Sequence, residues 1–225
     1  TVFEKAPKPG GLLRYGIPDF KLEKWIIDRR LKQMEEEGVR FETNVTIGED
    51  LSAQYLLKSF DAVLFAIGSE MPRDLQVSGR EQEGIWFAME YLARSNQYVD
   101  GILQREELID AAGKKVLVLG GGDTGSDCVG TANRQGAREV HQFEILDKPR
   151  EWKESWNPEW PGWPNILRTS SSHEEGCERR WNVLTKAFDK GGKHRVKGIF
   201  SEVDWLYDPV QKRYEMKERP GSGFS

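Results

Sequence analysis

The sequence contains only two cysteines, Cys128 and Cys177, among 225 residues. Two cysteines cannot build a disulfide framework, and neither belongs to a C-x-x-C pair that would indicate a metal or cluster site. This content is typical of a reducing compartment, so we expect a cytoplasmic protein. The histidines His141, His173 and His194 lack metal-ligand spacing, and we expect structural or surface roles for them.

Long apolar runs are also missing. No segment approaches the ~18 consecutive apolar residues of a membrane span, and the N-terminus lacks the basic-then-apolar pattern of a signal peptide. The 33 basic and 37 acidic residues leave a net charge of -4, which provides no general attraction to a phosphate backbone. We therefore expect neither a membrane protein nor a nucleic-acid-binding protein.

Strand and helix patterns alternate along most of the chain, as in α/β proteins with parallel sheets. In the first part the predicted elements are a strand at 1–5, a Pro/Gly loop at 7–18, a helix at 22–37, a strand at 39–45, and then a helix at 52–60, a buried strand at 61–68 and a helix at 85–95. The second part predicts a strand at 115–119, a helix at 124–135, a strand at 139–146 and extended segments at 181–190, 195–208 and 213–218. Turn signals between the last three segments predict an antiparallel meander.

These patterns predict an α/β fold with two Rossmann-like, doubly wound dinucleotide-binding units of the disulfide-reductase type. We expect a first domain at 1–95 and a second domain, carrying the antiparallel β-meander, at 96–225. The chain opens inside a strand pattern and ends in a Pro/Gly-rich stretch. We therefore expect it to be a fragment of a longer protein.

The sharpest motif is a G-x-G-x-x-G sequence placed between a predicted strand and a predicted helix. It consists of Gly120, Gly121, Gly122, Asp123, Thr124 and Gly125. In such a motif the glycines permit a tight turn, close approach of a diphosphate and close helix–strand packing. The helix dipole and free N–H groups favour the diphosphate. A plain glycine turn, with Asp123 and Thr124 as helix-capping residues, is the structural alternative.

A dinucleotide site also needs a side chain about 20 residues further on to bind the adenosine ribose. Glu144 has this spacing, at the end of the second predicted strand. A carboxylate there accepts hydrogen bonds from a ribose 2′-OH and repels a 2′-phosphate, which favours NADH. Lys148 and Arg150 follow in the next loop and are placed to bind that phosphate, so NADPH stays open. Glu144 also has the alternative of a solvated strand end.

Longer motifs resemble the small (beta) subunit family of glutamate synthase. The first half carries V-F-E-K at 2–5, G-G-L-L-R-Y-G-I-P at 10–18 and K-L at 21–22. The second half carries the glycine motif, D-C at 127–128, T-A-N-R-Q-G-A at 131–137 and R-T-S-S-S-H-E-E-G at 168–176. The resemblance spans nearly the whole chain.

The resemblance implies a flavoprotein that takes hydride from NADPH or NADH onto FAD. Electrons then pass through iron–sulfur clusters, in regions outside this chain or in the partner, to the glutamate synthase large subunit. There glutamate is formed from 2-oxoglutarate and glutamine-derived ammonia. Because the cofactors carry this chemistry, we assign no catalytic acid or base.

The resemblance also implies FAD-binding residues in the first half. Glu4 would bind the FAD ribose, Gly10, Gly11, Leu12 and Arg14 would line the flavin and diphosphate region, and Val45, Ala66 and Gly68 would border the adenine. The structural alternatives are a surface turn at Gly10–Gly11, a strand end at Gly68 and a simple ion pair for Arg14. The family's FAD glycine motif and its cysteine clusters are not in this sequence, so we do not expect these residues alone to retain FAD.

Two other functions remain open: a related electron-transfer module of the ferredoxin–NADP transhydrogenase or dihydropyrimidine dehydrogenase type, and a non-catalytic nucleotide-binding module. Four tryptophans, Trp152, Trp156, Trp160 and Trp163, crowd one loop. They either pack against their own domain or form a contact surface. Cys128 is expected to be a buried apolar residue and not a redox thiol.

Overall fold

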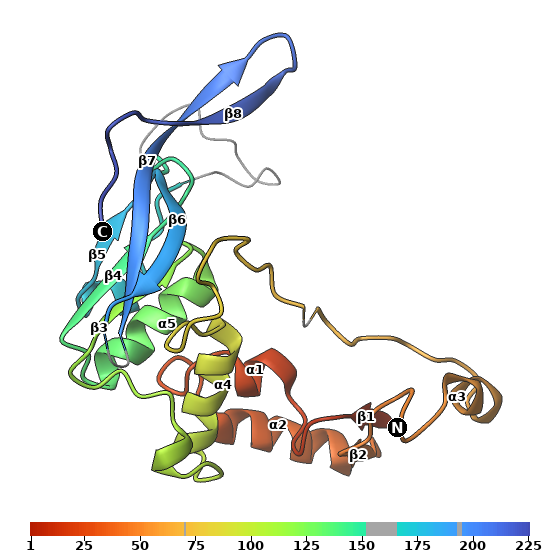
Figure 1. Cartoon of the computed structure of the whole chain (residues 1–225). Coiled ribbons are helices and arrows are strands. Elements are labelled where there is room, and N and C mark those ends of the chain that lie inside the picture. Colours follow the sequence, from red (N-terminus) through yellow and green to blue (C-terminus); the bar gives the residue numbers. More distant parts are fainter. Residues whose placement is uncertain (70, 152–165, 193–194) are drawn as a thin grey trace. The chain divides into compact units, whose positions relative to one another are not determined.

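The computed structural model describes residues 1–69, 71–151, 166–192 and 195–225. The chain forms two compact units: unit 1 comprises Thr1–Arg73 and Met89–Leu108, and unit 2 comprises Asp74–Ala88 and Ile109–Ser225 (Figure 1). The predicted tryptophan-rich loop and His194 lie outside the described residues. No helix in the described part of the chain is long and apolar enough to cross a membrane.

Unit 1 contains a small parallel sheet and several helices. The sheet pairs β1 (Val2–Glu4) with β2 (Phe41–Thr43), and the helices are α1 (Gly11–Tyr15), α2 (Lys24–Glu36), α3 (Ala53–Ser59), α4 (Ala88–Val99) and a 3-10 turn at Arg105–Glu107. Ser52 caps α3, because its hydroxyl accepts a hydrogen bond from the Tyr55 N–H at 3.2 Å. The predicted helices at 22–37, 52–60 and 85–95 are confirmed, with shifted ends.

The buried strand predicted at 61–68 is wrong. This segment has no regular structure, and its large apolar side chains are exposed, including Leu64 at 89% and Ile67 at 78%. An apolar run becomes a buried parallel strand only when it pairs into a sheet whose two faces are covered, usually by helices. In the described part of unit 1, β1 and β2 pair only with each other.

The loop predicted at 7–18 contains a helix that the sequence pattern did not reveal. Gly11–Tyr15 forms the single-turn helix α1, which starts after Gly10 at φ +131°. A Cβ atom on Gly10 would also lie 3.1 Å from the Arg14 Cβ. The backbone conformation at position 10 therefore favours glycine. The flanking Pro and Gly residues predict a loop, and tertiary contacts stabilise this short helix against that local preference.

Unit 2 begins with a parallel sheet in the order β3-β4-β5. Its strands are β3 (Lys115–Leu119), β4 (Glu139–Phe143) and β5 (Glu178–Arg180), and its helices are α5 (Asp123–Arg134) and α6 (Ser171–Glu174). Helix α5 packs on β3 and β4, and its Val129 and Ala132 are fully buried. The predicted strand–helix–strand unit is confirmed, whereas α6 and β5 were not predicted.

The predicted antiparallel meander is confirmed. It contains β6 (Val183–Lys190), β7 (Val196–Asp208) and β8 (Arg213–Glu218) in the order β6-β7-β8. The first half of β7 pairs with β6 and the second half with β8, so β7 runs through the whole sheet (Figure 1). Phe143 of β4 packs edge-on against Phe200 of β7, with ring centroids 5.1 Å apart. This aromatic core, completed by Val183 and Phe224, joins the two sheets of unit 2.

Cys128 is a buried residue of α5, as predicted, with 5% of its surface exposed. Burial, helped by the neighbouring Asp127 carboxylate, raises the pKa of its thiol to about 12. We expect Cys128 to resist a thiol reagent at pH 8 in the folded protein and to react fully in urea, as measured by mass spectrometry. Rapid labelling of Cys128 in the folded chain would contradict this placement.

The same shift has a consequence for stability at alkaline pH. In the unfolded chain the thiol has a pKa near the ordinary value of 9.0, so the unfolded state releases its proton first. The stabilising contribution of the neutral thiol is therefore complete below pH 9 and is lost as the pH rises from about 9 toward 12. A Cys128→Ala variant should lack this part of the alkaline loss of stability.

Candidate functional site

The glycine motif of unit 2 forms the turn between β3 and α5. Gly120 adopts φ +113°, a conformation that favours glycine, and its N–H donates to the Phe143 carbonyl at 2.8 Å. Gly122 is the N-cap of α5, and no side chain caps this helix end. The first N–H groups of α5 are thus open to an anion.

A cavity of about 200 Å³ lies at this end of α5. It is lined by Gly121, Gly122, Asp123, Ser126, Arg168, Ser170 and His173. A Cβ atom added to Gly122 would meet no atom within 4 Å, so the backbone is exposed to the space where a diphosphate would approach. The helix end favours a negatively charged ligand, and the lining includes one basic residue, Arg168, and one acidic residue, Asp123.

Glu144 lies directly beside the glycine loop. One of its carboxylate oxygens accepts a hydrogen bond from the Gly121 N–H at 2.6 Å, and the other accepts from the Leu146 N–H at 3.1 Å. The structure therefore brings the predicted ribose-binding acid against the glycine motif, as a dinucleotide site requires. Two charged residues of β5, Arg179 and Arg180, and the adjacent Trp181 line the same hollow as Glu144.

The two cations predicted for the 2′-phosphate have different positions. The Lys148 ammonium lies 5.3 Å from the Trp181 ring centroid, close to the residues that surround Glu144. The exposed Arg150 belongs to an isolated bridge with Ile166, and its carbonyl accepts the Leu167 N–H at 2.8 Å.

Sequence reasoning missed Arg179 and Arg180. The Arg179 guanidinium lies 4.9 Å from the Trp181 ring centroid, and partial burial lowers its pKa below the ordinary value. The signal that would have found them is topological. Because β5 lies parallel to β4, their carboxyl ends meet at one edge of the sheet, and Arg180 accepts the Glu144 N–H through its carbonyl at 2.8 Å.

In unit 1, the FAD-binding residues implied by the resemblance fall into three places. Glu4 and Val45 meet at the end of the β1–β2 sheet, where the Val45 N–H donates to the Glu4 carbonyl at 3.1 Å. The Glu4 carboxylate accepts the Ala6 N–H at 2.9 Å. Ala66 and Gly68 lie in the exposed segment that follows α3.

Gly10, Gly11 and Leu12 begin the α1 turn. Gly11 has φ +48°, and a Cβ atom there would meet nothing within 4 Å. Leu12 is 67% exposed and Leu13 51%. This edge of the loop therefore presents open backbone and exposed apolar side chains.

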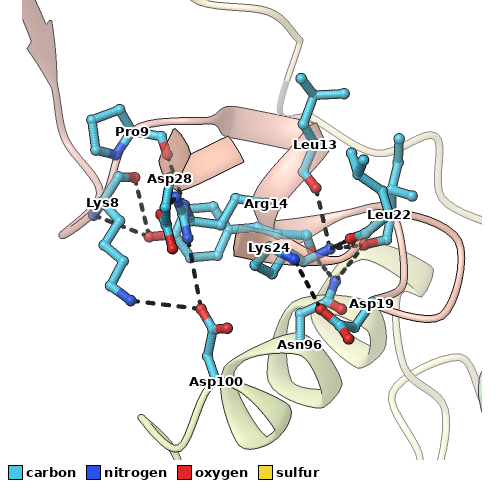
Figure 2. Close-up of polar contacts among 12 residues, drawn as sticks. Lys8, Pro9, Leu13, Arg14, Asp19, Leu22, Lys24, Asp28, Asn96 and Asp100 are labelled. Atoms are coloured by element: carbon cyan, nitrogen blue, oxygen red, sulfur yellow. Dashed lines mark hydrogen bonds and ion pairs between the residues drawn. The ribbon is translucent and has the colours of Figure 1, made fainter. Parts of the chain in front are cut away.

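Arg14 faces the interior of unit 1 and is only 2% exposed. Its guanidinium pairs with Asp28, donates to the Pro9 carbonyl at 2.8 Å and lies 3.8 Å from the Asp100 carboxylate (Figure 2). The ion pair that the sequence left open for Arg14 is present. Arg14 therefore holds the loop from inside, between α2 and α4.

Two further buried polar residues bind the carbonyl groups of this loop. The Lys24 ammonium donates to the carbonyls of Leu13, Ile17 and Leu22 at 3.3, 2.6 and 3.0 Å. The amide of Asn96, a residue of α4 that is labelled in Figure 2, donates to the carbonyls of Tyr15 and Ile17 at 3.1 Å. Together they bond partly buried backbone carbonyls of this loop.

We expect Asn96→Leu to lower the free energy of unfolding by about 1–3 kcal/mol, because the partly buried carbonyls of Tyr15 and Ile17 would lose their side-chain donor. Asn96→Asp should cost more, since its carboxylate would face carbonyl oxygens. Urea unfolding followed by circular dichroism measures both effects. Gln33→Leu, on the exposed face of α2, is the matched control and should change stability little.

Among the described residues, no group of three or more His, Cys, Asp or Glu side chains is placed to hold a metal ion. The predicted histidines have protein partners. His141 lies 3.3 Å from the Glu178 carboxylate, and His173 contacts Gln142 at 2.9 Å.

This chain is similar in sequence to known glutamate synthases. Glutamate synthase (NADPH) small chain from Mycobacterium tuberculosis is 50% identical over 192 residues, which are 84% of this chain and 39% of that protein. Glutamate synthase (NADH) from Schizosaccharomyces pombe is 41% identical over 228 residues, 97% of this chain and 11% of that protein. The resemblance predicted from the motifs is confirmed, and the chain spans less than half the length of these relatives.

The fold also resembles a solved structure. Mycobacterium tuberculosis FprA in complex with NADPH aligns with a TM-score of 0.70 at 16% identity, covering 99% of this chain and 60% of that chain. The predicted α/β class is thereby confirmed. The family model for pyridine nucleotide-disulphide oxidoreductases matches residues 34–160, more than half of the 225 residues. The chain belongs to the pyridine nucleotide-disulphide oxidoreductase family.

Proposed function

We propose that this chain is part of a glutamate synthase small subunit, in which unit 2 binds NAD(P)H and unit 1 contributes to an FAD site. The observation that carries this proposal is the cavity at the uncapped end of α5, with Glu144 hydrogen-bonded to the Gly121 N–H beside it. The relatives named above, which match most of this chain, support the same assignment.

In unit 2, the diphosphate would bind the open N–H groups at the start of α5. The loop proposed to surround the diphosphate comprises Gly120, Gly121, Gly122, Asp123, Thr124 and Gly125. Within it, the N–H groups of Gly120 and Gly121 already donate to the Phe143 carbonyl and the Glu144 carboxylate. Glu144 would bind the adenosine ribose, with Lys148 and Arg150 proposed near a 2′-phosphate. The Lys148 position beside Trp181, together with Arg179, favours Lys148 over Arg150 for that contact.

In unit 1, the residues proposed to contact FAD are Glu4, Gly10, Gly11, Leu12, Val45, Ala66 and Gly68. Arg14 would act on the flavin site from inside the loop, because it is buried between Asp28 and Asp100. FAD bound there would supply the two-electron acceptor for a hydride. The protein's part is to bind both cofactors and to exclude water from the hydride path.

The full protein is proposed to pass electrons through iron–sulfur clusters to a glutamate synthase large subunit. Neither Cys128, buried in α5, nor Cys177, whose thiol pKa is raised by burial, is suited to ligate a cluster. The clusters are therefore proposed to lie outside the described residues, and glutamate formation from glutamine and 2-oxoglutarate is proposed for the large subunit.

Calorimetric titration of this chain with NADH and with NADPH tests the dinucleotide site directly. We expect binding of at least one of them, and no binding of either would overturn the proposal. Reduction of an artificial dye by NAD(P)H, measured with the full-length flavoprotein, tests the oxidoreductase activity. Dinucleotide binding without dye reduction would indicate the non-catalytic module instead.

A further inference from the structure

A chain of hydrogen bonds connects α6 to the first glycine of the motif in unit 2. The Gln142 side chain is buried, at 2% exposure, and its Nε2 donates to the Gly120 carbonyl at 2.9 Å. Its Oε1 lies 2.9 Å from His173 Nε2. The other ring nitrogen of His173, Nδ1, accepts the Ser170 backbone N–H at 3.1 Å.

These contacts fix the hydrogen atoms along the chain. A backbone N–H can only donate, so His173 Nδ1 must be the unprotonated nitrogen and Nε2 must carry the proton. The Nε2–H then donates to Gln142 Oε1, which leaves the Gln142 NH₂ group directed at Gly120. Without His173, Gln142 Oε1 would lose its hydrogen-bond partner, and the contact with the Gly120 carbonyl alone would hold the amide.

The orientation of Gln142 matters because Gly120 and Gly125 are in close contact. A Cβ atom on Gly125 would lie 2.3 Å from the Gly120 carbonyl oxygen and 2.8 Å from Gln142 Nε2. The Gly120 N–H is already bonded to the Phe143 carbonyl. Gln142 thus bonds the Gly120 carbonyl, the other backbone polar group of this residue. Both backbone groups of Gly120 are then held, which fixes the direction in which the loop enters α5.

We propose that His173 is a positioning residue for the dinucleotide: it orients Gln142, and Gln142 holds the glycine loop in the conformation that receives the diphosphate. The inference rests on the proposed function of unit 2. His173 lines the cavity, but in this proposal it acts on the ligand indirectly, by holding Gln142 in position.

Two substitutions at position 173 separate this role from capping of α6. In His173→Asn the side-chain oxygen stands near the Nδ1 position, so it retains an acceptor for the Ser170 N–H but has no donor for Gln142. In His173→Gln the amide reaches the Nε2 position and can donate to Gln142. We expect His173→Asn to weaken binding of the dinucleotide about five- to tenfold and His173→Gln to stay within about twofold of the original chain.

Calorimetric titration with NADH and NADPH measures these affinities, and thermal unfolding shows that each variant is folded. Gln142→Glu is the second test: its carboxylate still accepts from His173 but cannot donate to Gly120, and it should weaken binding at least as much as His173→Asn. Glu174→Gln, an exposed change on the same helix, is the control and should bind normally.

The outcomes distinguish the two proposals. If the unmodified chain binds neither nucleotide, the proposed function fails. If the unmodified chain binds and the folded His173→Asn and Gln142→Glu variants bind equally well, only the positioning role fails. Equal losses in His173→Asn and His173→Gln would also overturn it, because direct contact of the imidazole with the ligand would then explain the effect.

Discussion

Replacing Gly125 with alanine is expected to destabilise unit 2 and to raise the dinucleotide Kd more than tenfold. The added Cβ would lie 2.3 Å from the Gly120 carbonyl oxygen, which is a backbone atom and cannot rotate away. The start of α5 would have to move from the end of β3, and overpacking of this kind costs about 1–3 kcal/mol. Urea unfolding and calorimetric titration of the same sample measure the two effects.

Gly122→Ala is the matched comparison, because its expected effect falls mainly on binding. Gly122 has φ -78°, and a Cβ atom there meets nothing within 4 Å. Alanine is a poorer N-cap than glycine, so we expect a loss of stability of no more than about 1 kcal/mol. The methyl group would, however, occupy the approach of the diphosphate and raise the Kd about tenfold or more. Normal binding by Gly122→Ala would show that the diphosphate does not lie over this residue.

These two glycines show what the sequence could predict about the site. The strand–glycine–helix order and the spacing to Glu144 are local features, and they predicted both the turn and the carboxylate beside it. The structure places the Glu144 carboxylate 2.6 Å from the Gly121 nitrogen. Distances along one βαβ unit are nearly fixed by the lengths of its elements, so spacing alone was sufficient.

The residues that the sequence did not predict come from elements that depend on tertiary contacts. Arg179 and Arg180 lie on β5, a strand of only three residues, and His173 lies on the four-residue helix α6. Elements this short carry no periodic pattern, and they form because β4 and α5 provide partners. Their residues enter the site only once the order β3-β4-β5 is known.

The strand predicted at 61–68 is wrong for the opposite reason: the local pattern is strong, but the tertiary partners are missing in the described part of unit 1. Its pattern is strong, since residues 62–67 are all apolar, yet Leu64 and Phe65 are 89% and 64% exposed. An apolar sequence pattern shows that a segment would be stable as a buried strand, but it does not show whether the chain provides the strands and helices that would bury it. The β1–β2 pair in the described part of unit 1 does not include this segment, and the apolar run remains exposed.

Glu144→Gln is expected to shift the preference of unit 2 toward NADPH by about tenfold, measured as the ratio of the two dissociation constants. The carboxylate lies beside Gly121, where the adenosine ribose of a bound dinucleotide would be placed. It accepts hydrogen bonds from a ribose 2′-OH but repels a 2′-phosphate. The neutral amide removes the repulsion and weakens the ribose contact, and a tenfold ratio corresponds to about 1.4 kcal/mol.

The neighbouring cations determine how far Glu144→Gln shifts the ratio of the two dissociation constants toward NADPH. Arg179 and Lys148 both lie against the Trp181 ring, and Arg180 pairs with Glu202 at 3.4 Å. Once Glu144 is neutral, Arg179 and Lys148 are the positive charges placed to attract a 2′-phosphate. The shift should therefore shrink when the titrations are repeated at high salt, since exposed charges are screened.

Glu139→Gln is the control, because it removes a carboxylate from the start of β4, at the other end of the strand from Glu144. Glu139 pairs with Lys115 at 2.6 Å, and this contact holds the pKa of its carboxyl below the ordinary value. Its loss should leave the NADH-to-NADPH ratio unchanged. If Glu144→Gln also leaves that ratio unchanged while both nucleotides still bind, the ribose must lie away from the end of β4. The proposed orientation of the dinucleotide across the sheet edge would then be wrong.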